Sequence, residues 1–178
     1  CTLEGFFWVP RTLMGFEKLM FAFADQPELL HAINRNLLDF NFRLLDKILA
    51  VCVPTFITIA EDMSYNHGPM ISKRTFDDFV APYYRQLIPR LLERNIMPFI
   101  DTDGDITLLV PWFAELGVDG FLPLERQAGV DGMRLRQRPD PQGDIGYSVF
   151  FEMKDRTARD RCIEELRKRK VPASTLAG

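Results

Sequence analysis

The chain has 178 residues, 47% of them hydrophobic and 26% charged, a balance that is typical of a folded globular protein and excludes extensive disorder. Its formal net charge of -3 and sequence pI of about 5.5 argue against a nucleic-acid-binding protein, which normally presents a basic face. The longest uncharged stretch, Ile48 to Ala60, is shorter than the roughly 20 residues that cross a bilayer, so we expect no membrane partner.

The first part of the chain is predicted to be helical. Residues 12–24 are apolar on several faces, as expected of a short helix that is packed on most sides. Asp25 is predicted to cap the next helix, and Pro27 to lie in its first turn. Apolar residues at helical spacing continue that helix to about Leu49. Cys52 lies in an apolar run and is predicted to be a small core residue.

Three short apolar runs, each ending in acidic residues, predict strands that are buried on both faces. They are residues 55–60, 97–100 and 120–124. Between the first two, Ser72 is expected to cap a helix that Pro82 interrupts and Pro89 kinks. Between the last two, residues 106–116 form a helical face that Gly117 ends.

The last part of the chain is predicted to add a fourth strand within residues 142–151 and a charged helix over residues 156–170. Strands that alternate with helices and lack polar alternation indicate βαβ units, which predicts an α/β fold with a parallel sheet. The length fits a single domain over residues 1–178.

Carboxylates follow the three predicted strands: Glu61 and Asp62, then Asp101 and Asp103, then Glu125. Because the carboxyl ends of parallel strands meet at one edge of a sheet, we expect these acids to line one pocket. Such a cluster could act as general acid and base, hold a hard cation, or accept hydrogen bonds from a ligand. Acids at loop starts also cap helices, and Glu125 could instead pair with a nearby arginine.

Several other polar residues lie near the predicted strand ends or elsewhere in the predicted helices. Tyr65 follows the first acidic pair and is expected to contact a ligand, and Arg11 could meet an anionic ligand or lie at the surface. Asp105 is predicted to be a helix cap, and His31, within the long helix, to be structural. His67 has no second His or Cys at ligand spacing nearby, so no metal ligand is assigned.

Seven short sequence blocks occur in a recognisable order between about residues 5 and 136. They are residues 61–65 (EDMSY) with 68–72 (GPMIS), 79–84 (FVAPYY), 101–105 (DTDGD), and 117–120 (GVDG) followed by 123–125 (PLE) and 128–131 (AGVD). Together they resemble the uroporphyrinogen decarboxylase-like superfamily. Asp105 departs from the asparagine that ends the family's D-x-D-G-N motif.

The resemblance implies that the chain is a partial (β/α)8 TIM barrel with parallel strands. That fold typically needs about 250 residues, so the chain is expected to lack the early strands and the final one. In the decarboxylases the early strands carry arginines and an aspartate for the carboxylates and pyrroles of the substrate.

Two chemistries occur in this superfamily. The decarboxylases remove acetate carboxyl groups from a tetrapyrrole without a cofactor, using a buried acid to support protonation of the pyrrole. The corrinoid-dependent methyltransferases bind zinc through a H-x-C pair, and Asp101 and Asp103 stand at those positions here, so the soft zinc site is missing. The resemblance implies, as the leading hypothesis, cofactor-independent decarboxylation of a tetrapyrrole or related polycarboxylate. The expected catalytic residues are Asp101, Asp103, Glu61 and Asp62, and the expected substrate-binding residues are Tyr65, Glu125 and Arg11.

Two alternatives stay open. One is a methyltransferase that works with a corrinoid protein and uses the acids, a corrinoid and a metal ion. The other is a non-catalytic barrel fragment, whose open sheet edges would favour association into homo-oligomers. The three cysteines form no C-x-x-C pair and predict no disulfide framework, which favours a cytoplasmic setting for all three hypotheses.

Overall fold

A parallel four-stranded sheet is the centre of the fold in the computed structural model, which describes residues 1–123. Its strands are β1 (Thr2–Glu4), β2 (Phe56–Ala60), β5 (Met97–Asp101) and β6 (Gly120–Leu122), in the spatial order β1-β2-β5-β6. All three pairings are parallel, and Ala60 of β2 lies opposite Asp101 of β5. The predicted α/β class with a parallel sheet is therefore confirmed.

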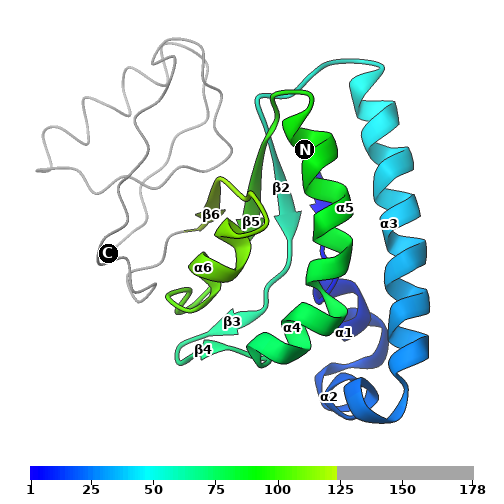
Figure 1. Ribbon diagram of the computed structural model, residues 1–178, viewed down its shortest axis with the longest axis vertical. Coiled ribbons are helices and arrows are strands. Elements are labelled where there is room, and N and C mark those ends of the chain that lie inside the picture. The colour runs from blue at the N-terminus through cyan, green and yellow to red at the C-terminus, as the bar shows by residue number, and fades with distance from the viewer. Residues whose placement is uncertain (124–178) are drawn as a thin grey trace, which may run out of the picture. The chain divides into compact units, whose positions relative to one another are not determined.

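Helices connect the strands (Figure 1). They are α1 (Trp8–Met14), α2 (Phe16–Asp25), α3 (Pro27–Leu49), α4 (Lys73–Phe79), α5 (Ala81–Leu92) and α6 (Leu109–Ala114). After β2 the chain also forms a small antiparallel pair, β3 (Ser64–Tyr65) with β4 (Gly68–Pro69). Figure 1 shows β2 running toward the end of the molecule where α1 and the β3–β4 pair lie.

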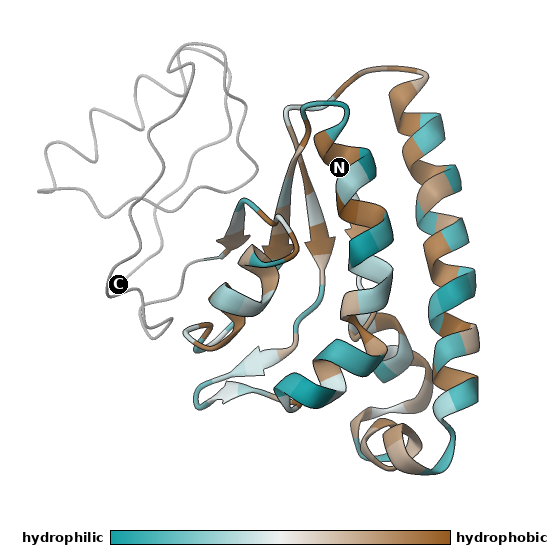
Figure 2. Ribbon diagram, in the orientation of Figure 1, coloured by the Kyte–Doolittle hydropathy of each residue, from teal (hydrophilic) through white to brown (hydrophobic). Residues whose placement is uncertain are grey.

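The two faces of the sheet differ in burial. Side chains that alternate along one face, including Leu3, Ile57 and Ile100, are 0% exposed. On the opposite face Phe56 and Phe99 are only half-buried, and their ring centroids lie 5.8 Å apart. Figure 2 shows β2 and β5 in hydrophobic colours and the connection that follows β2 in hydrophilic ones. Parallel sheets are normally covered on both faces, and here one face is covered more completely.

The N-terminal region departs from the sequence-based prediction in three ways. Residues 2–4 form β1, a strand that was not predicted because three residues are too few to show a pattern. The helix expected over residues 12–24 is two helices, broken at Gly15, whose φ of 80° ends α1. Asp25 ends α2 instead of capping α3; Gln26 is the N-cap of α3 and makes no side-chain capping bond.

Elsewhere the predicted elements are close to the observed ones. The long helix ends at Leu49, the Ser72 hydroxyl accepts a capping bond from the Thr75 N–H, and a break at Val80 separates α4 from α5, which contains Pro89. The helix predicted over residues 106–116 is shorter, covering only Leu109–Ala114.

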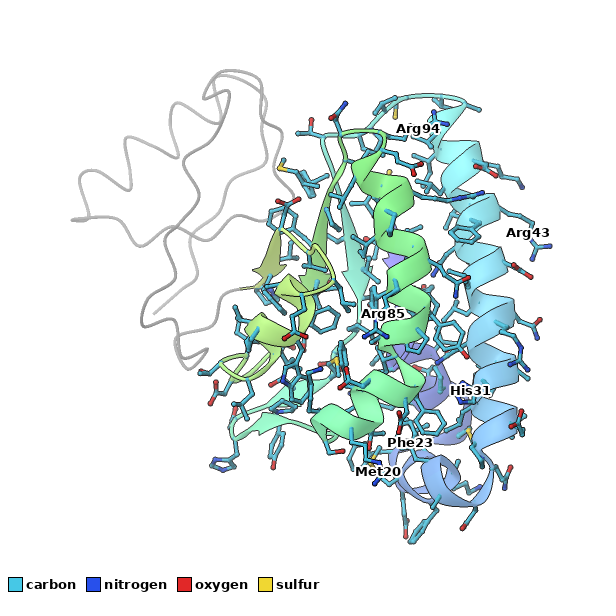
Figure 3. All side chains as sticks on the ribbon, in the orientation of Figure 1. Met20, Phe23, His31, Arg43, Arg85 and Arg94 are labelled. Carbon is cyan, nitrogen blue, oxygen red and sulfur yellow. The ribbon has the colours of Figure 1, made fainter. Side chains whose placement is uncertain are left out.

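His31 is structural, as predicted. Its ring stacks on Phe79 at 4.8 Å, and its Nδ1 lies 2.9 Å from the Tyr83 hydroxyl. Figure 3 shows it between α3 and α5, whereas Arg43 on the same helix projects away from the sheet. Cys52 is exposed, so its prediction as a core residue was wrong: the apolar run around it belongs to the turn before β2.

Part of the sequence-based prediction lies outside the described residues: the strand within 142–151, the helix over 156–170 and Glu125. The single-domain assignment over residues 1–178 also stays a prediction. No helix within residues 1–123 combines the length and apolarity that a membrane crossing requires.

Candidate functional site

Backbone hydrogen bonds join the carboxyl ends of β2 and β5. The Asp101 carbonyl accepts the Glu61 N–H at 2.9 Å and the Asp62 N–H at 3.0 Å. The Thr102 hydroxyl oxygen accepts the N–H groups of Met63 and Ser64 at 3.0 and 3.2 Å. The two acidic segments therefore meet at one edge of the sheet, as expected for neighbouring parallel strands.

Asp62 and Arg11 form an ion pair at this edge. Arg11 Nη2 lies 3.0 Å from Asp62 Oδ2, and Arg11 Nη1 donates to the Asp62 carbonyl at 2.6 Å. Asp62 has a φ of 38°, a left-handed conformation that few residues other than glycine adopt. Both side chains are partly exposed, at 24% for Arg11 and 34% for Asp62, so the pair can meet a ligand.

Asp101 is a partly exposed acid of the site whose protonated form is favoured by its surroundings. Burial raises its pKa, and the neighbouring charges of Asp103 and Asp62 raise it further. Three carboxylates near one another cannot all ionise easily, so one of them holds its proton to higher pH. Asp103 itself is exposed, which places it at the rim.

Glu61 is in a different environment, although it precedes Asp62 directly. Its side chain is 0% exposed. Oε1 accepts the Phe6 N–H at 2.8 Å and the Tyr84 hydroxyl at 2.7 Å, and Oε2 accepts the N–H groups of Phe7 and Trp8 at 2.8 and 3.1 Å. Burial raises the pKa of Glu61 to about 7, although these four hydrogen bonds oppose the rise. These contacts leave no direct route to solvent or ligand.

The β3–β4 pair carries Tyr65 and His67 beside the acids. Tyr65 is 48% exposed, and its ring centroid lies 5.7 Å from that of His67. The Asp105 N–H donates to the Tyr65 carbonyl at 2.9 Å, and the Ser64 hydroxyl bonds the Asp105 carbonyl. These two hydrogen bonds attach the β3–β4 pair to the loop that follows β5. Tyr65 therefore lies near the exposed rim of the site, where Asp103 also lies.

Asp105 stabilises the turn that precedes α6, but the N-cap of α6 is Leu108, so the predicted helix-cap role of Asp105 was wrong. Its Oδ1 accepts the Thr107 N–H at 2.9 Å, two residues ahead of the first residue of α6. Hydrogen bonds from Thr107 lower the pKa of the Asp105 carboxyl. Gly104, between the two aspartates, has a φ of 80°, and a Cβ there would lie 2.6 Å from the Tyr65 Cα, so only glycine fits between loop and hairpin.

Three residues that organise this edge were not predicted from sequence. Tyr84 lies in the sequence block 79–84, and nothing in its spacing distinguishes it from a core aromatic residue. Thr102 lies between two predicted site acids, Asp101 and Asp103, and no sequence pattern marks its own role. Gly5 admits the Glu61 side chain, because a Cβ on it would lie 2.6 Å from Glu61 Cδ. Each acts through a partner distant in sequence, which a local pattern does not reveal.

Within residues 1–123, no group of three or more His, Cys, Asp or Glu side chains is arranged to hold a metal ion. Glu125, the remaining predicted site residue, lies beyond the described part of the chain. Comparison of this chain with protein-family models, with curated proteins and with solved structures found no match.

Proposed function

We propose that this chain is part of a uroporphyrinogen decarboxylase-like enzyme, which removes a carboxyl group from a tetrapyrrole or related polycarboxylate without a cofactor. The observation that carries the proposal is the environment of Asp101. This acid lies at the carboxyl end of a parallel strand, its pKa is raised, and an Arg11–Asp62 pair lies at the end of the neighbouring strand. The motif order from residue 61 to residue 131 supports the same family.

The chemistry requires a proton donor more than a nucleophile. In such a decarboxylation the bond between the carboxylate carbon and its methylene breaks and CO2 leaves. The electron pair stays on the substrate until a proton adds to the carbon. A carboxyl group with a raised pKa supplies this proton and regains one from water, which is the role we assign to Asp101.

The other residues of the edge would bind the substrate. The guanidinium of Arg11 has five N–H donors, so its contacts with Asp62 leave donors for a substrate carboxylate. Asp103 is exposed and would accept pyrrole N–H groups, and the half-exposed Tyr65 would contact the ring face. The role of Glu125 stays a prediction.

The proposal includes a closed (β/α)8 barrel. Four parallel strands cannot close a barrel, so further strands would have to complete the sheet. The half-buried face with Phe56 and Phe99 would then face the barrel interior. Sequencing the coding DNA outward from both ends of this chain tests that requirement. We expect upstream sequence that encodes strands with an arginine cluster, and downstream sequence that encodes a last strand with a histidine. If the barrel proposal is wrong, neither the arginine cluster nor the histidine would be found.

The activity is tested on the protein as its gene encodes it, by measuring CO2 release from uroporphyrinogen. Asp103→Ala should abolish turnover and leave the unfolding midpoint unchanged. Asp46→Ala, on the exposed side of α3, is the matched control and should keep full activity. Unchanged turnover in Asp103→Ala would remove Asp103 from the mechanism, and no CO2 release by the unmodified protein would refute the proposal. Metal-dependent methyl transfer from methylcobalamin would instead identify the corrinoid alternative.

A further inference from the structure

Glu61 occupies the N-terminus of α1, where a capping side chain would normally be. The first N–H groups of a helix have no partner within the helix. Phe7 is the N-cap of α1 and provides no side-chain bond. The Glu61 carboxylate accepts the N–H groups of Phe6, Phe7 and Trp8 instead, so a residue at the end of β2 fixes where α1 begins.

Arg11 is attached directly to the residues that Glu61 holds. Its backbone N–H donates to the Phe7 carbonyl at 3.1 Å, within the first turn of α1. Its guanidinium carbon lies 5.1 Å from the centroid of the Trp8 ring. The position of the Arg11 side chain therefore follows the positions of Phe7 and Trp8.

Arg11 connects the start of α1 to the exposed edge of the sheet. Arg11 holds the carbonyl and the carboxylate of Asp62, the residue after Glu61. Two consecutive residues thus bind α1. Glu61 binds backbone N–H groups at its start from the buried side, and Asp62 binds the Arg11 side chain from the exposed side. The buried Glu61 carboxylate fixes where α1 begins, and the start of α1 fixes the position of the exposed Arg11 guanidinium.

We propose that Glu61 is a positioning residue, not a group that touches substrate, and that it holds Arg11 where it can bind a carboxylate of the ligand. The ligand class rests on the proposed decarboxylase function; the positioning role rests on the contacts alone. This replaces the catalytic role predicted for Glu61 from its place at a strand end.

Two substitutions separate this role from general support of the core. Glu61→Gln replaces one oxygen by an NH2 group, which cannot accept an N–H, so at least one of the three backbone donors loses its partner. Tyr84→Phe removes the hydroxyl bond but keeps the carboxylate and all three backbone bonds. Asn41→Ala is the matched control: the Asn41 amide is 0% exposed and binds the Glu4 backbone at 2.8 and 3.3 Å, with no contact to Arg11.

The first arm measures KM for uroporphyrinogen. Glu61→Gln should raise KM about 10-fold and leave kcat nearly unchanged, because a charge-assisted contact to the substrate is misplaced. In combination with Arg11→Ala it should add nothing to the effect of Arg11→Ala alone, because both remove the same interaction. The proposal would be overturned if the effects of Glu61→Gln and Arg11→Ala on KM multiply in the double variant. An equal rise in KM for Tyr84→Phe or Asn41→Ala would also overturn it.

The second arm needs no activity. In Glu61→Gln at least one of the Phe6, Phe7 and Trp8 amides should exchange with solvent at least about 10-fold faster, and the Arg11 guanidinium resonances should shift toward those of a free arginine. Tyr84→Phe and Asn41→Ala should leave both signals in place. If these signals do not change in Glu61→Gln, the positioning role is wrong even in an active enzyme; if they change in a protein that releases no CO2, only the decarboxylase proposal fails.

Discussion

Glu61 and Asp62 are neighbours in the chain and occupy opposite environments. Glu61 is fully buried and accepts four hydrogen bonds, three of them from backbone N–H groups. Asp62 is 34% exposed and pairs with Arg11. Both residues follow the last residue of β2, and Asp62 has a left-handed φ of 38°, so here the chain leaves the sheet and two adjacent acids serve the core and the edge separately. One carboxylate organises the backbone, and the other forms the electrostatic surface beside Asp101.

Within this comparison, the largest expected effect is on turnover and concerns Asp101, the acid whose pKa the charge of Asp62 helps to raise. Under the proposed function, Asp101→Asn should lower kcat by about 10² to 10⁴-fold, because the amide cannot supply a proton. The unfolding midpoint should stay equal or rise, because the substitution removes a partly buried acid close to Asp103 and Asp62. CO2 release and thermal unfolding of the same preparation measure both effects. A variant that keeps full turnover would show that Asp101 is not the donor.

The second prediction tests the buried acid of this comparison, Glu61. Glu61→Ala, measured at pH 5.5, should lower the free energy of unfolding by about 3 kcal/mol or more, because buried donors lose their acceptor and each costs about 1–3 kcal/mol. Urea unfolding measures it. Asp62→Ala in the same experiment provides the comparison, and equal losses in the two variants would contradict the division between a buried and an exposed acid.

The third prediction is a pH dependence that belongs to Glu61. Burial raises its pKa from 4.5 to about 7, so the folded chain keeps a proton that the unfolded chain has lost between these values. The free energy of unfolding should therefore fall as pH rises from 4.5 through 7, by up to about 3 kcal/mol. Subtracting the profile of Glu61→Gln from that of the unmodified protein isolates this contribution. A difference that is flat or rises with pH would show that the four hydrogen bonds outweigh burial.

The smallest effect is expected for the exposed pair. Asp62→Asn should change the free energy of unfolding by less than about 1 kcal/mol, because partly exposed ion pairs contribute little in water. High salt should reduce the difference further. Urea unfolding at low and high salt measures it. A loss comparable to that of Glu61→Ala would mean that Arg11 and Asp62 help to hold α1 as strongly as Glu61 does.

The sequence predicted those elements whose pattern is local. Continuous apolar runs located β2 and β5, helical spacing located α3, and Ser72 marked the start of α4. The same reasoning missed β1, because three residues carry no period. It also joined α1 and α2 across Gly15, since apolar residues continue on both sides of the break.

By itself, the sequence determined that this is an α/β protein with a parallel sheet and that acids gather at the ends of β2 and β5. These features follow from hydrophobic runs and from the place of polar residues after them. Only the tertiary structure decided what each acid does. Glu61 became a buried acceptor because Gly5 makes room for it and Tyr84 reaches it from α5; Asp62 became exposed because Arg11 reaches it from α1. These partners lie more than twenty residues away along the chain, so no local pattern encodes them.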